Sequence, residues 1–82
     1  ITGIIVSEGS DNVVNHNIVH NNSNGFYLMS AIRTNLSDNT AYDNDDGFTL
    51  DASDSSHFLN NTARNNDVYG FYAFLGSTQN IF

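Results

Sequence analysis

The sequence predicts an all-β protein in which the chain winds into stacked coils, a β-solenoid of about 3.5 coils. Three observations support this fold class. Glycines recur at an almost constant interval, apolar residues alternate with polar ones after each glycine, and asparagines return at fixed places in every repeat. Apolar residues at helical spacing over ten or more positions are absent from the sequence, so a solenoid built of helices is disfavoured.

The repeat is marked by Gly3, Gly25, Gly47 and Gly70, which lie 22, 22 and 23 residues apart. They divide the chain into coils over residues 3–24, 25–46 and 47–69 and a partial coil over 70–82. A chain of 82 residues has room for one domain only, so residues 1–82 form a single segment. Because the fourth coil is incomplete, we expect an excerpt of a longer solenoid or a subunit that stacks on others.

Apolar columns predict the strands of each coil. Residues one and three places after each glycine are apolar, and this alternation is typical of a strand with one buried face. A small residue follows where the chain bends, and a second strand and a short third strand complete the coil. The columns expected to face inward are Ile4, Phe26, Phe48, Phe71; Val6, Leu28, Leu50, Ala73; Val14, Leu36, Phe58, Ile81; and Val19, Ala41, Ala63, and the small residues at the tight bend are Gly9, Ala31, Ser53 and Gly76. Each coil is thus predicted to run strand, bend, strand, bend, short strand, bend.

Two asparagine columns stand at the later bends of each coil: Asn17, Asn39, Asn61 and Asn22, Asn44, Asn66. Identical residues on successive coils lie about 4.8 Å apart when the coils stack as neighbouring strands. At that distance a side-chain amide can bond to the amides above and below it and to turn backbone groups that would otherwise be buried unpaired. We therefore interpret both columns as structural ladders.

The composition excludes several classes of partner and site. Nine acidic residues against two basic ones give a formal charge of −7, which repels nucleic acid and anionic membranes. Without cysteine there is neither a disulfide framework nor a CxxC zinc motif. No apolar run approaches the length of a membrane span, so we expect no membrane insertion. The wealth of small polar residues favours an extracellular or cell-surface location, including secretion or the periplasm.

The repeats resemble the right-handed parallel β-helix repeats of the pectin-lyase-like superfamily, in particular those of NosD-like and archaeal surface proteins. The resemblance covers nearly the whole chain and is carried by the apolar pair after each glycine and by an asparagine-rich bend, as in Leu36–Ala41 and Asn60–Ala63. It implies a right-handed parallel β-helix. Similar proteins include polysaccharide lyases, mannuronan epimerases and non-catalytic surface proteins, so the resemblance implies architecture more than activity. The Asp-Pro-His signature of the epimerases is absent, since the chain has no proline.

One outward column on the third strand could carry chemistry. It comprises His20, Tyr42 and Arg64 on successive coils, flanked by the column of His16, Asp38 and Asn60. Proton abstraction next to a uronate carboxylate needs a cation together with a base and an acid within reach of one sugar ring. His20, Tyr42 and Arg64 are therefore weak catalytic candidates, and the alternative is a solvated polar face.

Aromatic residues form a surface stripe on the first strand, with Tyr27 and Tyr72 in one outward column and Phe74 beside them. Exposed rings can stack on sugars or can be covered by another layer of protein. Both interpretations stay open at this point.

An acidic bend ends the second and third coils, where Asp45 and Asp67 share a column near the amides of Asn44 and Asn66. Carboxylate and amide oxygens are the ligands that Ca²⁺ prefers, so Asp45 and Asp67 are weak calcium candidates. A solvated acidic edge is the alternative, and we expect no resident cofactor otherwise.

These observations favour a non-catalytic extracellular structural module used for assembly, adhesion or fibre formation. Its partners would be further copies joined end to end or flanking β-helix coils. The alternative is a carbohydrate-active domain that binds, cleaves or epimerises an acidic polysaccharide. Holding a polyanion needs several basic residues, and the chain has only Arg33 and Arg64, so the sequence favours the structural role.

Overall fold

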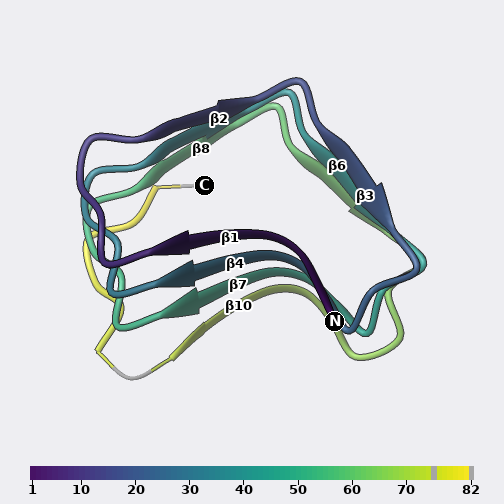
Figure 1. Ribbon diagram of the computed structural model, residues 1–82. Helices are drawn as coiled ribbons and strands as arrows, with labels where there is room; N and C mark the ends of the chain where they lie inside the picture. Colours follow the sequence, from purple (N-terminus) through teal and green to yellow (C-terminus); the bar gives the residue numbers. More distant parts are fainter. Residues whose placement is uncertain (75, 82) are drawn as a thin grey trace.

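The computed structural model describes residues 1–74 and 76–81, and in that part of the chain it contains ten strands (Figure 1). The strands are β1 (Thr2–Ser7), β2 (Val13–Asn15), β3 (Ile18–His20), β4 (Asn24–Met29), β5 (Asn35–Ser37), β6 (Thr40–Tyr42), β7 (Asp46–Asp51), β8 (His57–Leu59), β9 (Thr62–Arg64) and β10 (Tyr69–Phe74). They follow one another around successive coils, so the predicted all-β solenoid is confirmed.

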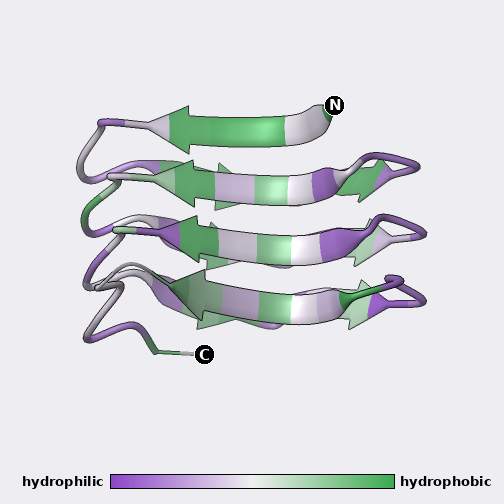
Figure 2. Ribbon diagram, turned by 90° about the horizontal axis from the view of Figure 1, so that it is seen from below, coloured by the Kyte–Doolittle hydropathy of each residue, from purple (hydrophilic) through white to green (hydrophobic). Residues whose placement is uncertain are grey.

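Every strand pairs in parallel with the strand in the same place on the next coil, which gives three sheets. Their orders are β1-β4-β7-β10, β2-β5-β8 and β3-β6-β9. Figure 2 shows the coils as stacked layers with green apolar segments lying above one another. The register places Phe26 beside Ile4 and Phe48, and Leu36 beside Val14 and Phe58. The columns read from the sequence therefore coincide with the strand pairing of the first three coils.

The bends differ from the prediction, because each coil has four corners rather than three. Between the first and second strands the chain turns twice, and the residue between these turns forms its own parallel bridges, Ser10 to Ile32 and Ile32 to Asp54. A residue with positive φ stands at each corner, and the four corner columns are Glu8, Ser30, Ala52; Asp11, Arg33, Ser55, Gln79; His16, Asp38, Asn60; and Asn21, Asp43, Asn65. Only some of these residue types favour the left-handed region, so the double corner gave no clear signal in the sequence.

The core is a set of stacked apolar columns enclosed by the three sheets. Phe26, Phe48 and Phe71 stack face to face with ring centroids 4.7 Å apart, and Phe58 meets the Phe48 ring edge-on at 6.0 Å. The core residues buried in the middle coils are Phe26, Leu28, Ala31, Leu36, Ala41, Phe48, Leu50 and Phe58. The strand spacing of the sheets thus sets the ring spacing of the core.

The fourth coil departs from the predicted columns at two places. Ile81 pairs with His57 rather than with Phe58, and it is 59% exposed instead of facing the core. Ser77, not Gly76, takes the place below Ser53, because it is Ser77 Oγ that accepts the hydrogen bond of the Ser53 amide. The chain has one more residue between β10 and this corner than earlier coils have, and this shift of one residue turns the predicted inward position outward.

Glycine is required in the first strand of a coil where another coil follows. A Cβ on Gly47 would lie 2.6 Å from the carbonyl oxygen of Gly70, and one on Gly25 would lie 2.6 Å from that of Gly47. A Cβ on Gly70 would meet nothing closer than the Ala63 Cβ, at 3.4 Å.

We predict that Gly47→Ala lowers the free energy of unfolding by about 2 kcal/mol or more, because the coils must separate to admit the methyl group. Gly70→Ala, the matched control, should change it by less than about 1 kcal/mol. Urea denaturation followed by circular dichroism measures both. Equal effects of the two variants would contradict the close approach of the coils at Gly47.

Candidate functional site

The polar ladders are built by the corners of the coils. Each corner residue with positive φ is followed by a residue that points inward, and at all four corners of the second coil the amide of that residue donates to a side chain of the third coil. The Asn17 amide donates to Asn39 Oδ1 at 3.0 Å, and the Asn39 amide to Asn61 Oδ1 at 3.0 Å. An inward amide has no water to bond, so the ladder side chain supplies the acceptor that a buried N–H requires.

The second asparagine column repeats this arrangement. The Asn22 amide donates to Asn44 Oδ1 at 2.9 Å, and the Asn44 amide to Asn66 Oδ1 at 3.1 Å. Asn44 Nδ2 also donates to Asn66 Oδ1 at 3.2 Å, and Asn39 Nδ2 donates in the same way to Asn61 Oδ1 at 3.0 Å. Asn39 and Asn44 are only 0% and 2% exposed, so these amides satisfy one another inside the protein.

Two further ladders occupy the double corner and were missed in the sequence. The Ala31 amide donates to Ser53 Oγ at 3.0 Å, and the Ser53 amide to Ser77 Oγ at 2.9 Å. At the neighbouring corner the Ser56 amide donates to Asn80 Oδ1 at 2.9 Å. The signal was the column Asn12, Thr34, Ser56 and Asn80, whose members are all polar but differ in type.

Thr34 and Ser56 share this last column but differ in their hydrogen bonding. Ser56 Oγ accepts from the Thr34 amide at 3.3 Å. Thr34 Oγ1 is buried and has no hydrogen-bond partner in the described part of the chain.

We predict that Thr34→Val raises the free energy of unfolding by about 1 kcal/mol, because it removes a buried hydroxyl that makes no hydrogen bond. Ser56→Ala should lower it by about 1–2 kcal/mol, because the Thr34 amide then loses its acceptor. Chemical denaturation of the two variants beside the parent protein measures the difference. Destabilisation by Thr34→Val would show that its hydroxyl is paired in solution.

The structure brings the three catalytic candidates together in one outward stack on β3, β6 and β9. The rings of His20 and Tyr42 are parallel with centroids 4.9 Å apart, and Arg64 Cζ lies 4.2 Å from the centre of the Tyr42 ring. Both faces of Tyr42 are therefore covered by its neighbours, which leaves the ring edge and the hydroxyl accessible. In the flanking column, His16 Nε2 lies 3.6 Å from Asp38 Oδ2.

The aromatic stripe on the outside of the first sheet also packs against itself. Tyr72 stacks between Tyr69 and Phe74, with centroid distances of 4.4 and 5.0 Å. Their ring faces are thus largely used in stacking on one another, although Tyr69 and Tyr72 stay 46% and 37% exposed. A sugar stacking on Tyr72 would have to displace a neighbouring ring.

Tyr27 takes part in a small polar cluster on this same outer surface. Its hydroxyl donates to Asp51 Oδ2 at 3.0 Å, and burial together with this carboxylate raises the pKa of Tyr27. Thr49, between Tyr27 and Tyr72 in the column, is only 3% exposed, and its hydroxyl donates to Asn24 Oδ1 at 3.2 Å. The aromatic stripe therefore shields this part of the first sheet, including Thr49, from water.

The acidic bend places Asp45 and Asp67 one coil apart, both exposed. The Asp45 amide donates to the Asn22 carbonyl, and the Asp67 amide donates in the same way to the Asn44 carbonyl. The side-chain oxygens of Asn44 and Asn66 accept ladder hydrogen bonds, so they would have to leave the ladder to bind Ca²⁺. Among the described residues no group of three His, Cys, Asp or Glu side chains is placed to hold a metal ion.

Comparison with known proteins assigns this architecture to a family. The family model described as "Right handed beta helix region" matches residues 2–82. The chain belongs to this family. The right-handed β-helix predicted by the resemblance is therefore confirmed. The family model covers right-handed β-helices in general, and it is consistent with a likeness to NosD-like repeats without identifying them. Neither a curated protein nor a solved structure matches the sequence.

Membership of the right-handed β-helix family establishes the architecture of the chain and leaves its activity open. Within the described residues no helix is long and apolar enough to cross a membrane.

Proposed function

We propose that this β-helix is a non-catalytic structural module of an extracellular or cell-surface protein, and that it joins other β-helix coils through its ends. The observation that supports the proposal best is the polarity of the asparagine ladders. The backbone amides of both ladders all donate in one direction, to the side-chain oxygen of the next coil. The side-chain amides also donate back to backbone carbonyls of the preceding coil.

This polarity leaves complementary groups at the two ends. In the first coil no described residue donates to the side-chain oxygens of Asn17 and Asn22. In the third coil no described side chain accepts from the amides of Asn61 and Asn66. The amides at the same positions of the second coil, those of Asn39 and Asn44, do donate to asparagine side chains. Each end carries the half of the hydrogen bond that the other end lacks, as a surface that joins further coils requires.

The ends also carry apolar surface that stacking would cover. Ile4 and Val6 pack against the core from the first coil but are only partly buried. At the opposite end Phe71 is 40% exposed, and Ala73 is exposed as well. Removing such surface from water stabilises a contact by about 25 cal/mol per Å². The outer edges of β1 and β10 add backbone groups that can pair with another strand.

The alternative function is binding, cleavage or epimerisation of an acidic polysaccharide on the face that carries Tyr42 and Arg64. Stacking of His20 and Arg64 on Tyr42 does place a cation beside a phenol. The same stacking covers the ring faces that a sugar would use, and the charge of −7 repels a polyanion. These points favour the structural role.

We predict that the protein self-associates as its concentration rises, and more strongly in high salt, because salt screens the repulsion between two chains of charge −7. Ala73→Asp should abolish association by placing a charge in the buried end contact. Leu59→Asp, which adds the same charge on an outward face of β8, should leave association unchanged. Sedimentation velocity and electron microscopy measure it, and association that survives Ala73→Asp would contradict the end contact.

We predict no retention of uronate oligosaccharides on a glycan array. Uronate binding that disappears in Arg64→Ala and persists in Arg33→Ala would instead establish the carbohydrate-active alternative. Arg33 is a suitable control because it belongs to another column, where Nε donates to Asp11 Oδ1 at 2.8 Å and Nη2 donates to Oδ2 at 3.0 Å.

A further inference from the structure

We propose that Asn24 is a site of spontaneous deamidation, which the folded β-helix blocks and which reacts when the start of β4 separates from its neighbouring strands. The product then disfavours the return of β4 to the sheet, so the modification makes this opening irreversible. Reaction at Asn24 would limit the chemical lifetime of the protein whatever binds its ends.

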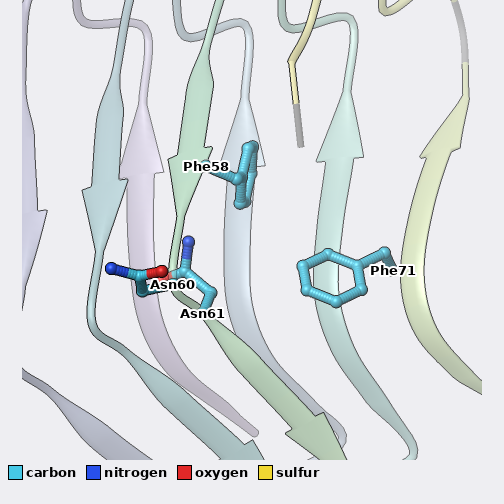
Figure 3. A pocket seen from close by; sticks show the side chains of 4 residues that line it. All are labelled: Phe58, Asn60, Asn61 and Phe71. Carbon is cyan, nitrogen blue, oxygen red and sulfur yellow. The ribbon is translucent and has the colours of Figure 1, made fainter.

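The sequence makes Asn24 the most reactive asparagine of the chain. Asn24 is followed by Gly25, and this is the only Asn-Gly step in the sequence. Glycine has no side chain to hinder ring closure and adopts backbone conformations that other residues avoid, so an unfolded Asn-Gly step deamidates faster than other asparagine steps. Figure 3 shows a contrasting case: Asn60 lines the pocket at the end of the core and is exposed, but the residue after it is Asn61, whose side chain hinders the same reaction.

The reaction joins the backbone of Gly25 to the side chain of Asn24. The Gly25 nitrogen attacks Asn24 Cγ, an N–Cγ bond forms, and the Cγ–Nδ2 bond breaks. Nδ2 leaves as ammonia with the proton that the Gly25 nitrogen loses. Water then opens the succinimide ring at either carbonyl, which gives aspartate or isoaspartate at position 24. Water is the only other reactant, so the reaction proceeds in plain buffer.

The folded strand blocks this ring closure in two ways. Ring closure requires the Gly25 nitrogen and the Asn24 side chain to lie on the same side of the Cα–C bond, and the extended backbone of β4 rotates this nitrogen away from the side chain. The Asn24 side chain is also held in place, because its Oδ1 accepts from the Thr49 hydroxyl at 3.2 Å. Gly25 is buried, and β4 pairs with both β1 and β7. The start of β4 must therefore open before Asn24 can react.

Both products would disfavour the return of β4 to the sheet. Asn24 is the register partner of Asp46 on β7, and Asp46 Oδ1 is already buried without a hydrogen-bond partner among the described residues. A second carboxylate at position 24 would repel it, as like charges directly opposite on neighbouring strands do. Isoaspartate also lengthens the main chain by one carbon next to Gly25, where a Cβ would lie 2.6 Å from the Gly47 carbonyl oxygen.

Mass spectrometry of peptides from the whole protein tests the proposal, because deamidation replaces NH₂ by OH and so raises the mass of the peptide that contains residue 24. We expect conversion at Asn24 to be roughly tenfold slower or more in the folded protein than in urea at the same pH and temperature, since reaction in the fold requires local opening. Equal rates in the folded and the unfolded protein would overturn the proposal.

A pair of threonine variants tests the role of the side-chain hydrogen bond. Thr49→Val keeps the shape of the residue but removes the hydroxyl that holds Asn24, so it should speed conversion of the folded protein about threefold or more. Thr62→Val, at an exposed threonine of β9, should leave the rate unchanged. Circular dichroism checks that both variants fold. The same rate in Thr49→Val as in the parent protein would refute protection by this hydrogen bond.

A pair of glycine variants tests whether opening at Gly25 limits the reaction. Gly3→Ala should speed conversion, because a Cβ on Gly3 would lie 2.7 Å from the Gly25 carbonyl oxygen and force the coils apart there. Gly70→Ala should not, because the nearest atom to a Cβ on Gly70 is 3.4 Å away. Equal acceleration by both variants would show that Asn24 reacts through unfolding of the whole chain, which contradicts local opening of β4.

The effect of the product is tested by Asn24→Asp. We expect this variant to lower the midpoint of urea unfolding by about 0.3 M or more, because the new carboxylate lies opposite Asp46. Asn15→Asp is the matched control, since Asn15 is exposed and its register partner Ser37 is uncharged, and it should leave the midpoint unchanged. An unchanged midpoint in Asn24→Asp would refute the claim that deamidation makes the opening irreversible.

Discussion

The inward amide at each corner of the coil is the constraint on which the rest of this β-helix depends. A chain that encloses a core must turn, and where it turns with positive φ the next N–H faces the interior, away from water. At the four corners of the second coil a side-chain oxygen of the third coil accepts from this N–H, supplied by asparagine at two corners and by serine at the other two. These hydrogen bonds persist when the repeat lengthens, since Ser53–Ser77 and Ser56–Asn80 are 24 residues apart whereas the bonds of the preceding coil join residues 22 apart.

The same spacing governs both sides of the sheets. Inside, it stacks phenylalanine on phenylalanine at 4.7 Å, and outside it stacks His20 on Tyr42 at 4.9 Å. Residues in the same column therefore contact each other, and the faces of the surface rings are covered by neighbouring side chains rather than exposed to a ligand. A row of functional groups on a solenoid is thus a weaker sign of catalysis than the same groups around a cleft.

Ladder hydrogen bonds also give the molecule a direction. The backbone amides of the ladders donate toward one end only, whereas apolar surface is present at both ends. Burial of apolar surface therefore favours contact at either end, and the ladder amides favour contact between unlike ends.

Periodicity in the sequence was sufficient for the fold, because stacking converts a linear interval into a spatial contact. The glycine interval, the apolar columns and the asparagine columns all survive in the pairing of the first three coils. The same interval identified the His20, Tyr42 and Arg64 column, although it could not show that their side chains stack on one another.

Structural features whose residues are not identical from one repeat to the next could not be predicted from the sequence. The double corner is held by a mixed column of Asn12, Thr34, Ser56 and Asn80, and several of its left-handed residues are types that seldom adopt that conformation. The shift of Ile81 out of the core column arises from one extra residue in a bend, and only strand pairing shows where an insertion is absorbed. The sequence by itself determined the solenoid, its inward columns and two of its ladders, since these depend on periodicity alone. The tertiary structure decided the corner geometry and the last register, because these depend on where individual amides and side chains meet across coils.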